Sequence, residues 1–122
     1  MNSRSKGKRG ELELRNVMRE EGFAGTRRGQ QFSGLGQADV VGGPKGWHFE
    51  CKRVESLNVW KAFEQAVRDA KPGQVPVVAM KRNRGTWLAV VDLRVLLRAI
   101  SLLELAGVEL RVPGGGLDDL VG

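Results

Sequence analysis

The segment Trp47–Arg53, with the sequence WHFECKR, decides how this chain folds. Its aromatic residues, its alternation and the Gly-Pro-Lys-Gly turn just before it predict a β-strand. Side chains on a strand alternate between two faces, so Phe49 and Cys51 share one face. Glu50 and Lys52 share the other. The pair by itself leaves open whether it serves chemistry or is an ordinary Glu–Lys pair on a solvated face.

Turn and helix signals outward from this strand divide the chain into alternating helices and strands. The expected elements, in chain order, are a flexible basic arm (1–8), a helix that ends at Gly22, a hairpin whose second strand is Ala38–Val41, the strand Trp47–Arg53, a helix within 56–71, two strands within 75–82 and 86–92, and a last helix over Leu93–Leu105.

This order predicts an α/β fold in which a mixed five-stranded sheet is flanked by helices. The two strands on either side of the middle helix are joined by a crossover, so we expect them to run parallel. We expect a single domain over residues 1–122, ending in a tail (107–122). In the middle helix the large apolar residues have the spacing of a core-facing stripe: Leu57, Trp60, Phe63 and Val67.

Composition restricts the class of protein. The chain has 122 residues, of which 41% are apolar, and no apolar run reaches the roughly 20 residues that span a bilayer. The lone Cys51 excludes an internal disulfide and a zinc site made of several cysteines. The basic N-terminal region lacks the apolar segment of a signal peptide. We therefore expect a cytoplasmic protein without a membrane span.

The positive charge is concentrated in one part of the chain. The net charge is +6, and the basic excess falls in residues 1–85, whereas residues 86–122 are net acidic. Such a distribution is typical of a protein that binds a polyanion. A protein that merely has a basic surface is the alternative that charge alone leaves open.

Asp39 precedes the central strand, and Glu50 and Lys52 lie on it. Asp39 starts the strand before Trp47–Arg53, and strands joined by a short turn usually pair, so Asp39 is expected beside Glu50. Two neighbouring carboxylates repel each other, and a divalent cation such as Mg²⁺ or Mn²⁺ removes that cost. The backbone carbonyl of Cys51 lies between them as a further oxygen ligand. Lys52 would orient a metal-activated water or screen developing negative charge. An ordinary Glu–Lys pair on a solvated face is the alternative.

Two further residues near this group are open to more than one interpretation. Glu11 lies at the margin of the apolar stripe of the first helix, where a carboxylate needs a partner. A metal centre is one candidate, and capping of the helix start is the other. His48 shares a face with Glu50, but we expect it to be a surface residue at the strand end.

Taken in order, these residues resemble the PD-(D/E)XK nuclease superfamily, with a helical Glu11, Asp39 in QADVVG, and then Glu50-Cys51-Lys52. KGKRGELEL and GFAGTRRGQQFSGLGQADVVG are similar to archaeal-type Holliday junction resolvases and their phage-encoded relatives. The resemblance implies a restriction-endonuclease-like fold. It also implies that Asp39 and Glu50 bind metal, that Lys52 is catalytic and that Glu11 completes the site.

The chain departs from that family at two places. The archaeal proteins typically have Arg after the helical Glu, where this chain has Leu12. Their catalytic Ser lies close before the Asp, and Ser33 is the nearest candidate in a longer turn.

Gln65 falls on the next helix, where several superfamily members have a polar active-site residue. A plain surface glutamine is the alternative.

The function that follows is metal-dependent hydrolysis of phosphodiester bonds in DNA. The resemblance implies a four-way junction as substrate and two symmetric cuts by a homodimer. The apolar last helix suits a dimer interface, and packing on its own sheet is the alternative. Nucleases acting on flaps, branched or linear DNA, and a non-catalytic basic DNA-binding module, are the competing functions. The residues expected to contact DNA are Lys6, Lys8, Arg9, Arg27, Arg28, Ser33, Lys81, Arg82 and Arg84.

Overall fold

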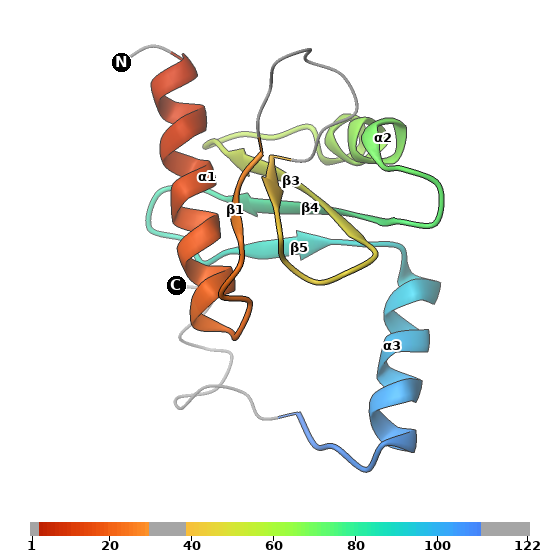
Figure 1. The fold of residues 1–122 in the computed structure, drawn as a ribbon. Coiled ribbons are helices and arrows are strands. Elements are labelled where there is room, and N and C mark those ends of the chain that lie inside the picture. The colour runs from red at the N-terminus through yellow and green to blue at the C-terminus, as the bar shows by residue number, and fades with distance from the viewer. Residues whose placement is uncertain (1–2, 30–38, 111–122) are drawn as a thin grey trace.

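The computed structural model describes residues 3–29 and 39–110. The described elements are α1 (Ser3–Glu20), β1 (Arg27–Arg28), β2 (Val40–Val41), β3 (Trp47–Arg53), α2 (Val59–Asp69), β4 (Val75–Lys81), β5 (Leu88–Val90) and α3 (Leu93–Leu105). Figure 1 shows their arrangement. The chain therefore has the predicted α/β order, and its described part contains a five-stranded mixed sheet.

The sheet follows the order of the sequence, β1-β2-β3-β4-β5. β3 and β4 run parallel over their full length, from Trp47 opposite Val75 to Arg53 opposite Lys81. The other neighbouring strands are antiparallel. The parallel pair confirms the predicted crossover through α2. β3 consequently lies at the centre of the sheet, with β2 and β4 at its two edges.

Two hydrophobic clusters cover the two faces of the sheet. Leu14 and Met18 of α1 pack with Val40 and Ala79, and Phe49 and Cys51 join this cluster. On the other face, the cluster consists of Ala62, Ala66 and Val78, with Leu57, Phe63, Met80 and Val90 packed around it. Consecutive residues of a strand point to opposite faces, so Val78 and Ala79 serve different helices. α1 therefore lies on the Cys51 face of β3, and α2 lies on the Glu50 face.

The first helix begins earlier than the sequence predicts. α1 starts at Ser3, so the prediction of a flexible arm over residues 1–8 is wrong for residues 3–8. Lys and Arg have high intrinsic helix propensity, and they extend the helix beyond the turn where its apolar stripe begins. Lys6 and Lys8 are therefore helical residues.

The buried face of α2 differs from the predicted one. Trp60 is 79% exposed and Val67 is 51% exposed, whereas Ala62 and Ala66 are buried. The prediction weighted side-chain size, but the positions that meet the sheet carry alanines. Small residues there allow the helix to approach the strands closely. Leu57 and Phe63 pack against this cluster as predicted, so the prediction is wrong for Trp60 and Val67 only.

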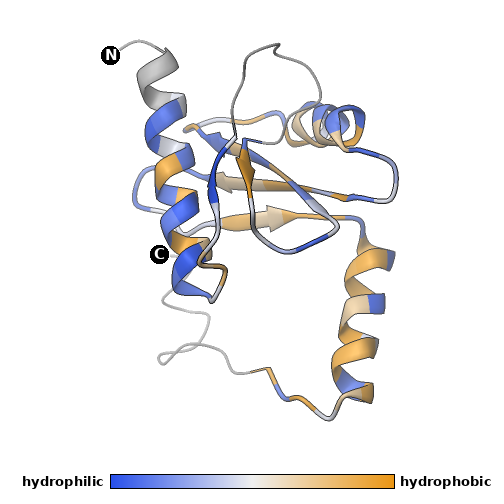
Figure 2. Ribbon diagram, in the orientation of Figure 1, coloured by the Kyte–Doolittle hydropathy of each residue, from blue (hydrophilic) through white to orange (hydrophobic). Residues whose placement is uncertain are grey.

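The last helix matches its predicted bounds, but it is not covered by the rest of the described chain. The Asp92 side chain accepts a hydrogen bond from the Val95 N–H as the expected N-cap. No residue of α3 is buried, and the helix extends away from the sheet (Figures 1 and 2). The alternative in which α3 packs on its own sheet is therefore wrong within the described residues. In that part of the chain, no helix is both long and apolar enough to span a membrane.

Candidate active site

Asp39 is held against β3 by main-chain and side-chain hydrogen bonds. Its N–H donates to the carbonyl of Phe49 at 3.1 Å, and its own carbonyl accepts from Gly29 N–H at 2.9 Å. The carboxylate oxygen Oδ2 accepts a 2.7 Å hydrogen bond from the N–H of Cys51. The strands β2 and β3 pair at Val40 and Phe49, so Asp39 stands at the end of this pairing. Its side chain therefore lies beside β3.

The structure brings Asp39 and Glu50 together. Glu50 is only 1% exposed. Burial is the main cause that raises the pKa of Glu50 to about 9, and the charge of Asp39 and a side-chain hydrogen bond to Asp39 follow. Two carboxyl groups at this range cannot both ionise without cost. In the absence of a cation, the proton on Glu50 relieves the repulsion.

His48 is buried, and the prediction that it is a surface residue is wrong. It is 2% exposed, and its Nε2 lies 2.7 Å from Oε1 of Glu50. Burial lowers the pKa of His48, against the opposing charges of Asp69 and Asp39. The register explains the error: His48 pairs with Pro76 inside the parallel ladder, so it is not at a frayed strand end. The imidazole thus holds one oxygen of Glu50.

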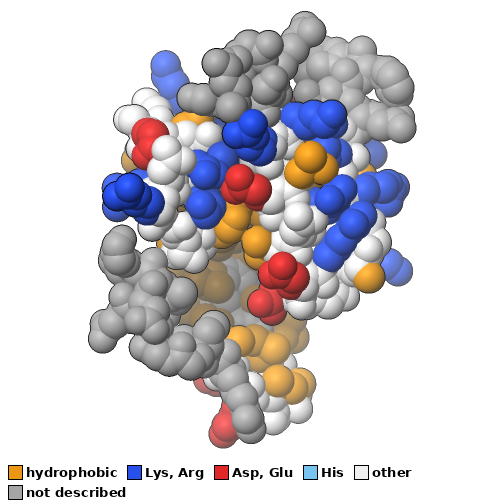
Figure 3. Space-filling view, turned by 90° about the vertical axis from the view of Figure 1, so that its left-hand side faces the viewer, with side chains coloured by type: hydrophobic (Ala, Val, Ile, Leu, Met, Phe, Trp, Pro, Cys, Tyr) orange, Lys and Arg blue, Asp and Glu red, His pale blue; other side chains and the backbone are white. Residues whose placement is uncertain are grey.

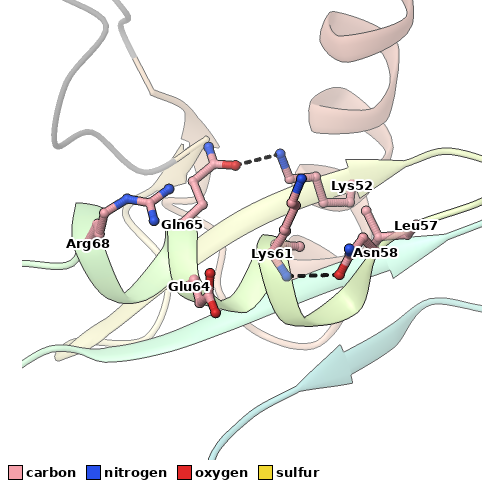
Figure 4. Close-up of a pocket in the computed structure, with 8 residues that line it drawn as sticks. Lys52, Leu57, Asn58, Lys61, Glu64, Gln65 and Arg68 are labelled. Carbon is pink, nitrogen blue, oxygen red and sulfur yellow. Dashed lines mark hydrogen bonds between the residues drawn. The ribbon is translucent and has the colours of Figure 1, made fainter.

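Lys52 of β3 and Gln65 of α2 are in direct contact. The ammonium Nζ of Lys52 donates to Oε1 of Gln65 at 2.9 Å (Figure 4). The positive charge of Lys52 is also one of the influences on Glu50, where it acts to lower the pKa. Gln65 therefore fixes the amine on the same face of β3 as Glu50. This is more than the plain surface glutamine of the alternative interpretation.

Glu11 lies on the α1 side of β3, where the charge of Asp39 acts on it. It is 8% exposed, and Nε of Arg28 donates to its Oε1 at 3.1 Å. Burial raises the pKa of Glu11, the charge of Asp39 adds to this rise, and Arg28 opposes it. Glu11 stands near the middle of α1, so the capping interpretation is wrong. Arg28 was expected to contact DNA, but here it pairs with Glu11, and only the Glu11 side of this ion pair is buried.

Cys51 follows Glu50 on β3, and its N–H donates to the carboxylate of Asp39. Its thiol packs in the α1 cluster, and burial raises its pKa to about 12, so thiolate chemistry is not expected. The N–H and C=O of one strand residue point to the same edge. Because the N–H of Cys51 meets Asp39, its carbonyl points toward the same edge. Its role as a metal ligand stays a prediction.

These groups fit a magnesium-type ion. Mg²⁺ is typically bound by one or two carboxylates while it keeps several waters. Asp39, Glu50 and the carbonyl of Cys51 supply such a set of hard oxygen atoms. Within residues 3–29 and 39–110, no cluster of three or more His, Cys, Asp or Glu side chains has the arrangement of a metal site. A site here would therefore depend on two carboxylates, a carbonyl and water.

Most of the residues predicted to contact DNA are accessible. Figure 3 shows Lys and Arg side chains spread over the face seen from the α1 side. Lys81 is partly buried on β4, Lys6 belongs to α1, and Ser33 lies outside the described residues. The exposed members of the predicted set are Lys8, Arg9, Arg27, Arg82 and Arg84.

Two basic residues beside Lys52 were missed in the sequence. Lys61 and Arg68 line a pocket together with Lys52 and Gln65. Their spacing offered a signal, because positions 61, 65 and 68 lie on one face of a helix. Arg53 was also missed. It binds Glu13 of α1 at 3.1 Å and Asn83 at 2.9 Å, and so ties the helix to β3 and to the β4–β5 turn.

Comparison of the chain with protein-family models, curated proteins and solved structures gives no match. Function is therefore inferred from the geometry of these residues.

Proposed function

We propose that this protein is a metal-dependent DNA endonuclease of the PD-(D/E)XK type with a restriction-endonuclease-like fold. One observation carries the proposal. Asp39 and Glu50 lie within hydrogen-bonding range of each other, and Lys52 stands on the same strand face as Glu50 with its amine held by Gln65. The combination of two close carboxylates and a positioned amine suits hydrolysis of a phosphodiester.

Each residue has a role that its contacts support. Asp39, Glu50 and the Cys51 carbonyl would hold Mg²⁺, and Mn²⁺ would substitute. The bound ion would supply a water of lowered pKa and stabilise negative charge on phosphate oxygens. Lys52 would orient that water or screen the developing charge. Glu11, beside Asp39 and paired with Arg28, would complete the acidic cluster and help to set its charge.

The proposed substrate is a four-way DNA junction, which requires two symmetric cuts. A two-fold dimer provides two sites in the required relation. The exposed apolar stripe of α3 supports pairing with a second copy, since its residues recur at the spacing used between packed helices: Leu93, Leu96, Leu97, Ile100 and Leu103.

A panel of labelled substrates tests the proposal. The purified full chain is incubated with a four-way junction, a flap and a linear duplex, with Mg²⁺ or with EDTA. We expect paired symmetric nicks in the junction only, and only with Mg²⁺. Cutting of all three substrates would instead show a less selective nuclease of the same type. Binding without cutting under every condition would indicate a non-catalytic DNA-binding module and overturn the nuclease proposal.

Active-site variants link the activity to the residues. We expect Asp39→Asn, Glu50→Gln and Lys52→Ala each to abolish cleavage while junction binding persists. Glu20→Gln and Lys45→Ala are matched controls, because both residues are exposed and lie outside the site. Wild-type cleavage by any of the three site variants would show that the site is elsewhere.

A further inference from the structure

A groove opens directly beside Lys52 along α2. Its volume is about 440 Å³. Figure 4 shows that its polar side chains come from the end of β3 and from one side of α2. The charged and polar residues that line it are Lys52, Asn58, Lys61, Glu64, Gln65 and Arg68.

The positive charges of this groove outnumber the negative ones within the described residues. Three cations and the single carboxylate of Glu64 line it, which gives a net charge of +2. In that part of the chain, neither Lys61 nor Arg68 has a carboxylate within ion-pair distance. The side chains are thus available to an external anion, unlike Arg28 and Arg53, which bind carboxylates of α1.

The amide groups of the groove add hydrogen-bond donors. Oδ1 of Asn58 accepts the N–H of Lys61 at 3.1 Å, and Oε1 of Gln65 accepts Lys52 Nζ at 2.9 Å. Because both amide oxygens are used inside the protein, each side chain retains its NH₂ group as a donor. Apart from Glu64, the polar side chains of the groove therefore offer donors to a ligand. This arrangement suits an anion rich in oxygen acceptors.

We propose that this groove binds the phosphodiester backbone of the DNA strand beside the phosphate that is cut, with Lys61 and Arg68 as phosphate ligands. The inference rests on the proposed function for the identity of the anion. Continuity with Lys52 favours DNA, because a strand in the groove runs directly into the acidic site. Seven residues of helix span roughly 10 Å, close to the axial length of about three nucleotides. The groove thus covers a short segment of one strand.

The test measures DNA binding without cleavage. Fluorescence anisotropy gives the Kd of a labelled four-way junction for the full chain in EDTA, over a series of NaCl concentrations. Each lost phosphate contact reduces the slope of log K against log salt by about 0.9, so Lys61→Ala/Arg68→Ala should reduce it by roughly 1.8. We also expect binding about tenfold weaker or more at fixed salt, and retention of the wild-type slope by Lys61→Arg/Arg68→Lys.

A charge-matched double variant controls for loss of net charge. Lys45→Ala/Lys71→Ala removes two exposed cations that do not line the groove. It should change the salt slope less than Lys61→Ala/Arg68→Ala does. Thermal unfolding of every variant checks that the fold is retained. Equal slopes and equal Kd values for the two double variants would overturn the inference.

Other outcomes separate the groove from the nuclease. If the wild type binds DNA without cutting it and only the groove variant loses affinity, the inference that the groove binds DNA holds and the nuclease proposal fails. If the wild type cuts junctions and the groove variant behaves as the control does, the groove inference fails alone. Equal binding of DNA and of a poly-glutamate peptide by the wild type would overturn the assignment to DNA.

Discussion

At the scale of single residues, the site depends on how Glu50 is surrounded. Its carboxyl group is buried, hydrogen-bonded to His48 on one side and close to Asp39 on the other. Each neighbour has a separate physical effect. His48 fixes the orientation of one oxygen, and Asp39 makes ionisation costly unless a cation is present. The same surroundings would thus strengthen metal binding and weaken the folded state when no metal is bound.

The raised pKa of Glu50 predicts how the stability of the metal-free protein depends on pH. A raised folded-state pKa gives a contribution that is fully present below the unfolded value of 4.5 and is lost as pH rises toward about 9. We expect the free energy of unfolding of the wild type to fall, relative to Glu50→Gln, between pH 5 and 9. The slope is at most on the order of 1 kcal/mol per pH unit.

Urea unfolding in EDTA at pH 5, 7 and 9 measures this difference. His48 acts in the opposite direction, because its lowered pKa gives a contribution that is present above 6.5 and lost only as pH falls through the lower folded value. Addition of Mg²⁺ at pH 8 should stabilise the wild type and not Glu50→Gln. If the free energies of unfolding of the two proteins depend on pH in the same way, the raised pKa of Glu50 is contradicted.

Gln65 is predicted to act by positioning Lys52. Its removal in Gln65→Ala leaves the amine without the 2.9 Å contact. A misplaced group costs up to about 100-fold in rate, so we expect kcat to fall by roughly 10- to 100-fold with a small change in KM. Single-turnover cleavage measures this effect. Val67→Ala, an exposed position of α2 outside the groove, is the control, and an equal loss of rate in both variants would refute the specific role of Gln65.

At the scale of elements, the contact between α1 and β3 sets the position of Glu11. α1 lies very close to the strand at Gly10, where an added Cβ would lie only 2.6 Å from Cβ of Arg53. Arg53 then binds Glu13 of the same helix at 3.1 Å. A glycine followed by a buried carboxylate allows the helix to bring Glu11 close to Asp39. The approach of the two elements therefore has a direct consequence for the charge of the site.

Two glycines of α1 provide a matched pair for testing this contact. Gly10→Ala should destabilise the fold by about 1–3 kcal/mol, because the added methyl overpacks against the Arg53 stem. Gly7→Ala has open space around the new Cβ, and it should stabilise the helix by roughly 0.5–1 kcal/mol. Urea unfolding of both variants shows whether each substitution raises or lowers the free energy of unfolding. Stabilisation by Gly10→Ala would show that α1 can move away without cost.

At the scale of the whole molecule, α3 is the feature that a single copy leaves unexplained. Its leucines and its isoleucine are exposed, from Leu103 at 40% to Leu105 at 84%, and Figure 2 shows hydrophobic residues along most of this helix. An apolar stripe of this kind usually marks an interaction surface. A second copy would cover it and would place two active sites in one particle.

The dimer is tested by two substitutions on α3. Ile100→Glu lies at the centre of the apolar stripe, and Leu102→Glu lies about 160° away from it around the helix, at 100° per residue. We expect Ile100→Glu to sediment as a monomer and to lose paired cutting of junctions, whereas Leu102→Glu remains dimeric. Analytical ultracentrifugation distinguishes the two states. A wild-type monomer at all concentrations would exclude the dimer.

The sequence alone determined the α/β order, the parallel pairing through the crossover helix, and the placement of Glu50 and Lys52 on one face of the central strand. These features follow from short-range signals, namely periodicity, turn residues and alternation. Only the tertiary structure decided which partners those side chains meet. Burial of His48, the pairing of Arg28 with Glu11 and the exposure of Trp60 and α3 depend on register and on helix positions. Those are set by packing between segments far apart in the chain, which local patterns do not encode.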